Sequence, residues 1–355
     1  MPSARPTVAA IETLSIEGFS PDCFTTMRGL FDQPLLFEPL YQSRVWGGTA
    51  FKSSLGRALP QGGPFGEAWD MVDRPEAQSL VAEGPWAGVS LHELWTTHRE
   101  PVFGKNLPES ERFPLILKIL DAREALSVQV HPPEQAALEG LGEPKTEAWV
   151  VLDAQPQAAV YAGFRSGVDR SRFERALTSG NVEPLLHRIP VQSGDTLFIP
   201  SGRCHAIGAG CLLAEVQQNS DTTYRVYDWD RLGLDGRPRE LHIEQSLRCI
   251  TFNDTEPGLI TPNGEELIRC DHFQIHRWTL RQARPANGSE TPARGAFFLV
   301  ESGSVRCAER EFARGAGFWM PAAASSRTEL VPLNDTAKLL RFSPTPRHSA
   351  GILLS

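Results

Sequence analysis

The sequence predicts a mostly β protein. Of its 355 residues, 28 are proline and 30 are glycine, and they divide the chain at short intervals. Long amphipathic stretches are few, whereas short apolar runs bounded by turn residues recur. Such spacing is typical of short strands joined by turns rather than of a helical bundle. A chain of this length can bury one large core or two smaller ones, and we expect two.

Three segments are expected along the chain. Residues 1–26 lack a periodic pattern and are predicted to form a loose N-terminal extension. Residues 27–255 are predicted to form one β domain with N-terminal strands and short helical insertions. The strand pattern restarts after about Glu256, so residues 256–355 are expected to form a second, smaller β domain.

Apolar runs and turn residues locate the individual elements. Leu35 to Leu94 is expected to form loops and strands. The strands expected after it are Phe113 to Leu120, Leu126 to His131, Glu147 to Leu152, Thr196 to Ile199, Leu212 to Val216, Tyr224 to Tyr227, Phe273 to Leu280, Ala296 to Val300, Gly317 to Met320 and Lys338 to Phe342. The expected helices are His92 to Thr97 and Glu134 to Leu141, together with Arg170 to Leu177 and Val182 to Leu186, which form one helix or two.

The charge balance excludes one class of partner and leaves another open. The formal net charge is −8, whereas nucleic-acid-binding proteins concentrate Lys and Arg to neutralise phosphates. We therefore expect no nucleic-acid partner, while an anionic small molecule can bind where a few cations line its pocket. No stretch approaches the ~20 apolar residues that cross a bilayer, and residues 1–26 lack the apolar core of a signal peptide, so no membrane partner is expected either.

The cysteines predict neither a zinc ribbon nor a disulfide scaffold. They form no CxxC pair and no evenly spaced framework; they are Cys23, Cys204, Cys211, Cys249, Cys270 and Cys307. Reduced thiols in a cytoplasm fit this arrangement best.

Four polar residues are candidates for one metal site. Side chains alternate between the two faces of a strand, so Gln129 and His131 point the same way and can reach one ion. Glu147 follows in the next strand, and His205 follows the strand that ends at Pro200. Two imidazoles, one carboxylate and one amide oxygen suit zinc with open positions, and two histidines with one carboxylate also suit non-haem iron.

The spacing around His205 strengthens this interpretation. Gly194 to His205 resembles the second cupin motif, G-x5-P-x-G-x2-H, at every specified position through the histidine. The final Asn of that motif would fall at Ala209 and is missing. In the first cupin motif, Gln129 replaces the first histidine and Glu147 is displaced by a helix-sized insertion.

Together these departures resemble the type I mannose-6-phosphate isomerases, in their short bacterial form, rather than the dioxygenase cupins. Further fragments are similar to that family and follow its order: Trp46-Gly47-Gly48, Gly66-Glu67-Ala68-Trp69, Ser127 to Pro132, Lys145-Thr146-Glu147, Pro200-Ser201-Gly202, His205 to Gly208 and Gln217 to Arg225. The resemblance is strongest from Phe113 to Leu247 and faint after that.

The resemblance implies a cupin jelly-roll fold, a sugar-phosphate substrate and one zinc ion per chain, bound by Gln129, His131, Glu147 and His205. It also implies aldose–ketose isomerisation in carbohydrate metabolism, by proton transfer between C1 and C2. That reaction removes a C–H proton α to a carbonyl and must stabilise an enediolate. A metal can orient the sugar oxygens or polarise the carbonyl, and the sequence leaves both roles open.

Three charged residues are candidates for catalysis. Lys145 precedes Glu147 by two residues and on a strand would share its face; it either contacts a sugar oxygen, transfers a proton or is a solvated surface lysine. Arg225 is the better candidate for stabilising negative charge at O1 or O2, with an ion pair to Asp221 or Asp228 as the alternative. Asp221 is expected to orient Arg225 or contact sugar hydroxyls.

Two further residues are expected to contact substrate. Lys118 interrupts an apolar strand, where a charge is costly unless it is paired or opens into a cavity, so it either contacts substrate or points outward from an edge strand. Ser127 shares the face of Gln129 and His131. Since no glycine-rich phosphate loop is present, side chains must hold the phosphate.

The second half repeats part of the cupin pattern without its ligand. Gly315 to Pro321 again reads Gly-x5-Pro, but Ser326 stands where the histidine would fall. We expect a second cupin-like sandwich without metal, which packs against the first or closes over its site.

Two other functions fit the same residues. One is a sugar-responsive binding protein that has the fold but no turnover, and the retained ligand and charged residues argue against it. The other is an iron-dependent cupin oxygenase, which the neutral Gln129 disfavours.

Overall fold

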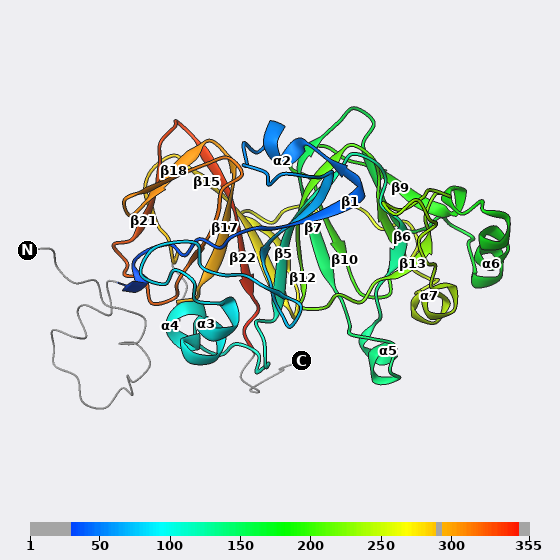
Figure 1. Ribbon diagram of the computed structural model, residues 1–355, viewed down its shortest axis with the longest axis horizontal. Coiled ribbons are helices and arrows are strands. Elements are labelled where there is room, and N and C mark those ends of the chain that lie inside the picture. Colours follow the sequence, from blue (N-terminus) through cyan, green and yellow to red (C-terminus); the bar gives the residue numbers. More distant parts are fainter. Residues whose placement is uncertain (1–29, 289–292, 348–355) are drawn as a thin grey trace, which may run out of the picture.

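The computed structural model describes residues 30–288 and 293–347. The predicted extension over residues 1–26 lies outside this described part. Strands dominate the chain, which confirms the mostly β prediction and agrees with a cupin-type fold (Figure 1). None of the described helices is long and apolar enough to cross a membrane.

Two antiparallel sheets form the first half of the molecule. The six-stranded sheet has the order β1 (Leu40–Gly48), β2 (Phe65–Met71), β5 (Leu115–Ala122), β12 (Cys211–Gln218), β7 (Glu147–Ala154) and β10 (Thr196–Ile199). The five-stranded sheet that faces it has the order β13 (Tyr224–Tyr227), β6 (Val128–Val130), β11 (His205–Ile207), β8 (Ala159–Phe164) and β9 (Leu186–Pro190).

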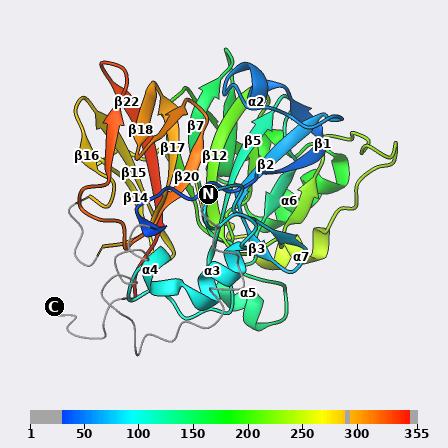
Figure 2. The ribbon, with the colours of Figure 1, turned by 60° about the vertical axis from the view of Figure 1, so that its left-hand side comes forward.

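A second pair of sheets follows along the chain. One has the order β14 (Glu266–Arg269), β15 (Phe273–Leu280), β22 (Ala337–Pro344), β17 (Ala296–Ser302) and β20 (Gly317–Met320). The other has the order β16 (Arg284–Pro285), β21 (Glu329–Pro332), β18 (Ser304–Cys307) and β19 (Arg310–Ala313). Separately, in the first half of the chain, β3 (Asp73–Arg74) and β4 (Ala77–Gln78) form a two-stranded ribbon. Figures 1 and 2 show the two pairs side by side.

Short helices lie at the periphery. They are α2 (Ala50–Ser53), α3 (Leu91–Thr97), α4 (Arg99–Phe103), α5 (Glu134–Leu138), α6 (Arg170–Ser179), α7 (Ile243–Cys249) and the 3₁₀ turn η2 (Glu183–Leu185). Helix α6 begins where the Asp169 side chain accepts a hydrogen bond from the Arg172 N–H, and it ends at Gly180 in the left-handed conformation. The helices are therefore short insertions between strands, as the sequence predicts.

Alternation along the six-stranded sheet explains where the site lies. On β12, Leu212, Ala214 and Val216 join the large core that packs against the second pair of sheets. Leu213 points the other way, into the core between the first two sheets. Because the side-chain period is two, Glu215 also points between the first two sheets. The interior of this sandwich is therefore apolar at one end and polar at the other.

Several predicted strands coincide with the observed ones, and a few differ. Thr196 to Ile199, Tyr224 to Tyr227, Phe273 to Leu280 and Gly317 to Met320 match β10, β13, β15 and β20. The helix predicted over Val182 to Leu186 is wrong: only a 3₁₀ turn forms, because Leu186 already begins β9 and pairs with Phe164 of β8. The division into domains near residue 255 stays a prediction.

Candidate metal centre and the cavity beside it

Three strands bring the four predicted ligands together. Gln129 lies in β6, and His131 directly follows that strand. Glu147 is the first residue of β7 and His205 the first residue of β11. Gln129 and His205 are cross-strand partners in the five-stranded sheet, and β7 approaches from the facing sheet. The side chains thus converge from both layers of the sandwich.

The distances within this group are those of a compact cluster. Single ligand atoms of His131, Glu147 and His205 all lie within 4.8 Å of one another. Glu147 Oε2 lies 3.3 Å from His131 Nε2, and Glu147 Oε1 lies 3.4 Å from His205 Nε2. Gln129 Nε2 lies 3.3 Å from the same His205 nitrogen. A half-turn of the amide exchanges Nε2 and Oε1 and so presents an oxygen there.

Backbone carbonyls orient both imidazoles. His131 Nδ1 lies 3.0 Å from the Thr222 carbonyl oxygen, and His205 Nδ1 lies 2.8 Å from the Arg203 carbonyl oxygen. A carbonyl only accepts, so each Nδ1 carries the hydrogen and each Nε2 keeps its lone pair. Both free lone pairs point toward Glu147, which is the arrangement that a ligating histidine needs.

Burial and charge fix the protonation of the cluster. Burial, aided by the charge of Lys145, lowers the pKa of His131, and burial lowers the pKa of His205 to about 3. Burial acts to raise the pKa of Glu147, but the charge of the Lys145 ammonium outweighs it and holds the pKa well below its usual range. Neutral imidazoles and an ionised carboxylate are the forms that bind a cation.

Glu147 shows that these residues fit a metal ion. Its side chain is fully buried, and neither carboxylate oxygen accepts a hydrogen bond of regular geometry from the described residues. The Lys145 ammonium lies 2.7 Å from Oε2 and gives charge compensation on one side only. A buried carboxylate is costly unless it is paired or coordinates a metal. Among the described residues, this is the only such group of His, Cys, Asp and Glu.

Lys145 reaches the cluster, although not in the predicted way. It precedes β7 in a loop, so the expected strand alternation does not position it. Its ammonium nevertheless lies 3.2 Å from His131 Nε2, and the residue is only 5% exposed, which contradicts the alternative of a solvated surface lysine. Burial opposes its charge, but Glu147 and Glu215 outweigh burial and raise the pKa of Lys145, which keeps it cationic.

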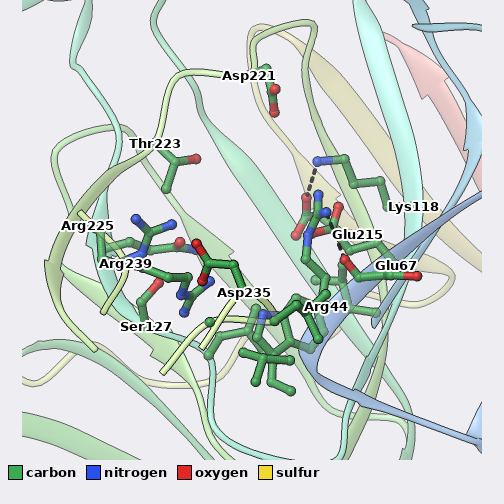
Figure 3. A pocket seen from close by; sticks show the side chains of 18 of the residues that line it. Arg44, Glu67, Lys118, Ser127, Glu215, Asp221, Thr223, Arg225, Asp235 and Arg239 are labelled. Carbon is green, nitrogen blue, oxygen red and sulfur yellow. Dashed lines mark hydrogen bonds and ion pairs between the residues drawn. The ribbon is translucent and has the colours of Figure 1, made fainter. Parts of the chain in front are cut away.

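A cavity of about 610 Å³ opens beside the cluster (Figure 3). Gln129 and Lys145 line its inner end, and Ser127 and Thr223 contribute hydroxyls. Its cations are Arg44, Lys118, Lys145, Arg225 and Arg239, and its carboxylates are Glu67, Glu215, Asp221 and Asp235. A cavity of this size and polarity holds a small, charged, hydrogen-bonding molecule.

Arg225 lies next to the metal ligands. It is the cross-strand partner of Gln129, so both side chains stand on one face of the sheet. One terminal nitrogen donates to the Glu240 carbonyl oxygen at 2.7 Å, while its buried Nε has no partner among the described residues. Burial, with the charge of Arg239 second, lowers its pKa.

Neither aspartate expected beside Arg225 pairs with it. Asp228 instead binds Arg231 at 2.8 Å and Arg239 at 2.7 Å. Asp221 lines the cavity, but Figure 3 shows it apart from Arg225. The expectation that Asp221 orients Arg225 is therefore wrong, because a backbone carbonyl does so, and a contact with sugar hydroxyls remains for Asp221.

Lys118 points into the cavity. Strand β5 lies inside the sheet, between β2 and β12, which contradicts the alternative of an edge strand. Its Nζ lies 3.8 Å from Glu215 Oε1 and 4.7 Å from the centre of the Trp69 ring. Burial, with the charge of Glu147 second, raises the pKa of Glu215 to about 7.

Five charged residues of the cavity were not predicted from the sequence: Arg44, Glu67, Glu215, Asp235 and Arg239. Glu215 interrupts an apolar strand just as Lys118 does, so the same argument could have found it. Arg239 and Asp235 come from a loop after β13, where no strand alternation indicates direction.

Comparisons with known proteins agree on one family. Residues 35–158 match the family model described as the catalytic domain of phosphomannose isomerase type I. The mannose-6-phosphate isomerase of Bacillus subtilis strain 168 is 40% identical over 258 residues, covering 70% of this chain and 80% of the relative. That of Streptococcus mutans is 39% identical over 255 residues, covering 70% and 79%.

A solved structure extends this similarity to the fold. The crystal structure of mannose 6-phosphate isomerase from Bacillus subtilis superposes with a TM-score of 0.76 at 32% sequence identity. The match covers 87% of this chain and 99% of the other. The similarity therefore includes both pairs of sheets.

Proposed function

The chain belongs to the type I phosphomannose isomerase family, and we propose that it interconverts mannose 6-phosphate and fructose 6-phosphate. The observation that carries this proposal is the buried Glu147 carboxylate, which lies between two lone-pair-bearing imidazoles at the inner end of a cationic cavity. A sugar phosphate offers both the hydroxyl oxygens and the anionic end that such a cavity would bind.

We assign Gln129, His131, Glu147 and His205 as the holders of one zinc ion per chain. Two neutral imidazoles, a carboxylate and an amide oxygen leave room for further ligands, as catalytic zinc sites do. When bound, the ion supplies a positive charge that orients sugar oxygens or polarises the carbonyl. The five described cysteines are free, and reduced thiols support a cytoplasmic location for the enzyme.

The remaining residues of the cavity have separate roles in the proton transfer between C1 and C2: they stabilise charge, move the proton or bind the substrate. Arg225 stays protonated and stabilises negative charge on O1 or O2 of the enediolate. Lys145 stands beside the ligands and contacts a sugar oxygen or carries the moving proton. Lys118 and Ser127 bind the substrate, and Asp221 accepts hydrogen bonds from sugar hydroxyls.

An assay with and without chelator tests this function. Purified protein should convert mannose 6-phosphate to fructose 6-phosphate, lose that activity on dialysis against a chelator and regain it with zinc. No conversion by the zinc-loaded protein would defeat the proposal in favour of a binding protein. Recovery only with iron, accompanied by dioxygen consumption, would indicate the oxygenase alternative.

Removing the central carboxylate should remove the metal. Glu147→Ala is expected to lose both bound zinc and activity, because the remaining ligands are neutral. Metal analysis of the purified variant measures this directly. Glu301→Ala removes a glutamate that pairs with Arg277 in the second pair of sheets, so it should keep its zinc. Full zinc content in Glu147→Ala would remove Glu147 from the ligand set.

A further inference from the structure

Two short motifs in β1 and β2 have no role in the mechanism above. One contains Arg44 and Trp46, and the other contains Gly66, Glu67 and Trp69. The two strands are antiparallel neighbours with an irregular register near these residues. Arg44, Trp46 and Glu67 all line the cavity, so the motifs bring charged groups to the substrate's side of the sheet.

Both oxygens of Glu67 are held by donors. Arg44 Nε donates to Oε1 at 2.7 Å, and Trp69 Nε1 donates to Oε2 at 2.6 Å. Gly66 makes room for this bridge, since a Cβ there would lie 2.7 Å from Arg44 Cβ and 2.6 Å from the Trp46 ring. The carboxylate is thereby fixed in direction as well as in place.

Lys118 lies beside this bridge but is not one of the two donors to Glu67. It is the cross-strand partner of Trp69, and its Nζ lies 4.7 Å from the centre of that ring. Its ion pair to Glu215 is a loose 3.8 Å. Burial acts to raise the pKa of Glu67, but Lys118 and Arg44, in that order, outweigh burial and lower it. Glu67 is therefore ionised, and the Lys118 ammonium contributes to its lowered pKa.

We propose that Arg44 is a positioning residue, which holds Glu67 away from Lys118 so that the Lys118 ammonium stays available to the sugar phosphate. This inference rests on the proposed function, in which Lys118 binds the substrate. Without Arg44, Oε1 of Glu67 loses its donor, and Lys118 is left as the other cation whose charge lowers the pKa of Glu67. A direct pair between Glu67 and Lys118 would then compete with the substrate for the ammonium.

A double-mutant cycle separates this role from a direct contact between Arg44 and substrate. The variants are Arg44→Ala, Glu67→Gln and the double variant, measured as zinc-loaded, full-length enzyme. Arg44→Ala should raise the KM for mannose 6-phosphate by about tenfold with a smaller change in kcat. In the Glu67→Gln background the same change should cost less than about twofold, because the competing carboxylate is gone.

Further variants serve as controls for this cycle. Arg44→Lys retains a cation beside Glu67 and should restore most of the wild-type KM. Arg277→Ala removes a comparable half-buried arginine, which pairs with Glu301 at 2.9 Å in the second pair of sheets, and should leave KM unchanged. If Arg44→Ala does not fold, Arg44→Met keeps the apolar stem and takes its place in the cycle.

Either of two results would overturn the inference. An equal loss in both backgrounds would mean that Arg44 touches the substrate itself, and an unchanged KM in Arg44→Ala would mean that it has no role. The cycle is repeated by calorimetry of mannose 6-phosphate binding, so a wild type that binds without turnover refutes the proposed isomerase and still decides the role of Arg44. A wild type that does not bind the sugar phosphate overturns both.

Discussion

Arg225 illustrates how one side chain can be tied to both the metal centre and the cavity. Its strand partner is the ligand Gln129, and its Nε is buried without a partner among the described residues. Leaving a charged group partly unsatisfied is costly unless a ligand completes its hydrogen bonds. The enediolate oxygens of the proposed reaction would supply that missing acceptor.

Arg225→Ala should therefore lower turnover while leaving the metal in place. We expect kcat to fall on the order of 100-fold, as for loss of a charge contact made in the transition state. Metal analysis and a coupled isomerase assay measure the two effects separately. Arg188 also donates to a backbone carbonyl, Gln157 O at 2.8 Å, but does not line the cavity. Arg188→Ala should keep full turnover, and near-normal turnover of Arg225→Ala would remove Arg225 from the mechanism.

Glu215 makes stability depend on pH. Burial, with Glu147 second, raises its pKa from 4.5 to about 7. Between these values the folded chain binds a proton that the unfolded chain has released, so stability falls as pH rises across this range. Glu215→Gln should match wild type near about pH 4 and exceed it by up to about 3 kcal/mol above pH 7.

Urea unfolding of the chelator-treated protein across this range measures the effect. Glu174→Gln, at a partly exposed glutamate of α6 that pairs with Arg170, controls for the change in net charge. A difference between Glu215→Gln and wild type that stays constant with pH would contradict the assignment.

Single residues could be predicted from the sequence where spacing constrains them. The cupin spacing located His205, and strand alternation placed Gln129 and His131 on one face; the structure brings both histidines to Glu147 and Gln129 to His205. Arg44 could not be found this way, because its direction depends on a register irregularity between β1 and β2. Such a shift changes which face a side chain occupies and leaves no trace in the apolar pattern.

At the scale of elements, the loop between β10 and β11 supports the metal centre. Gly202 has a φ of +87°, and its N–H donates to the His131 carbonyl at 2.9 Å. Its own carbonyl accepts from the Thr251 N–H at 2.8 Å. A Cβ at this position would lie 2.6 Å from Thr251 Oγ1. The glycine of the cupin motif is thus required both by its backbone conformation and by close packing.

Gly202→Ala should destabilise the chain and loosen its metal. Gly180 also has a positive φ, of +68°, but nothing lies within 4 Å of its would-be Cβ. Gly180→Ala should therefore cost only about 1 kcal/mol, for the left-handed backbone alone. Gly202→Ala should cost more and release zinc at lower chelator concentration. Thermal unfolding and chelator titration test this, and equal effects of the two variants would refute a link between this loop and the ligands.

Strands were predicted where apolar runs were long, and missed where the run was broken. Strand β8 was overlooked because Gly163 and Ala residues dilute its apolar content, yet all six of its residues are buried. Strands β18 and β19 mix polar and apolar residues over only four positions each, too few to establish a period. Burial by a neighbouring sheet, rather than local sequence, decides these elements.

At the scale of the whole molecule, one core joins the two pairs of sheets. It contains Leu117 and Val150 from the six-stranded sheet together with Phe297 and Leu340 from the second pair. Arg57 adds a polar link, because it binds Asp70 of β2 at 2.6 Å and the Gly315 carbonyl oxygen at 2.9 Å. The halves therefore share the apolar surface that stabilises each of them, and we expect the chain to unfold as one unit.

Trp319→Ala tests this coupling at its centre. Trp319 belongs to β20 in the second pair, yet its ring packs 5.1 Å from Phe103, and its Nε1 donates to the Val102 carbonyl at 3.0 Å. Losing the ring should cost about 3–5 kcal/mol. Because the core is shared, calorimetry should show a single transition at lower temperature, with zinc released in the same step. Trp278 belongs to the core cluster inside the second pair, so Trp278→Ala tests whether that pair can unfold separately. Two separate transitions in either variant would show that the halves are independent.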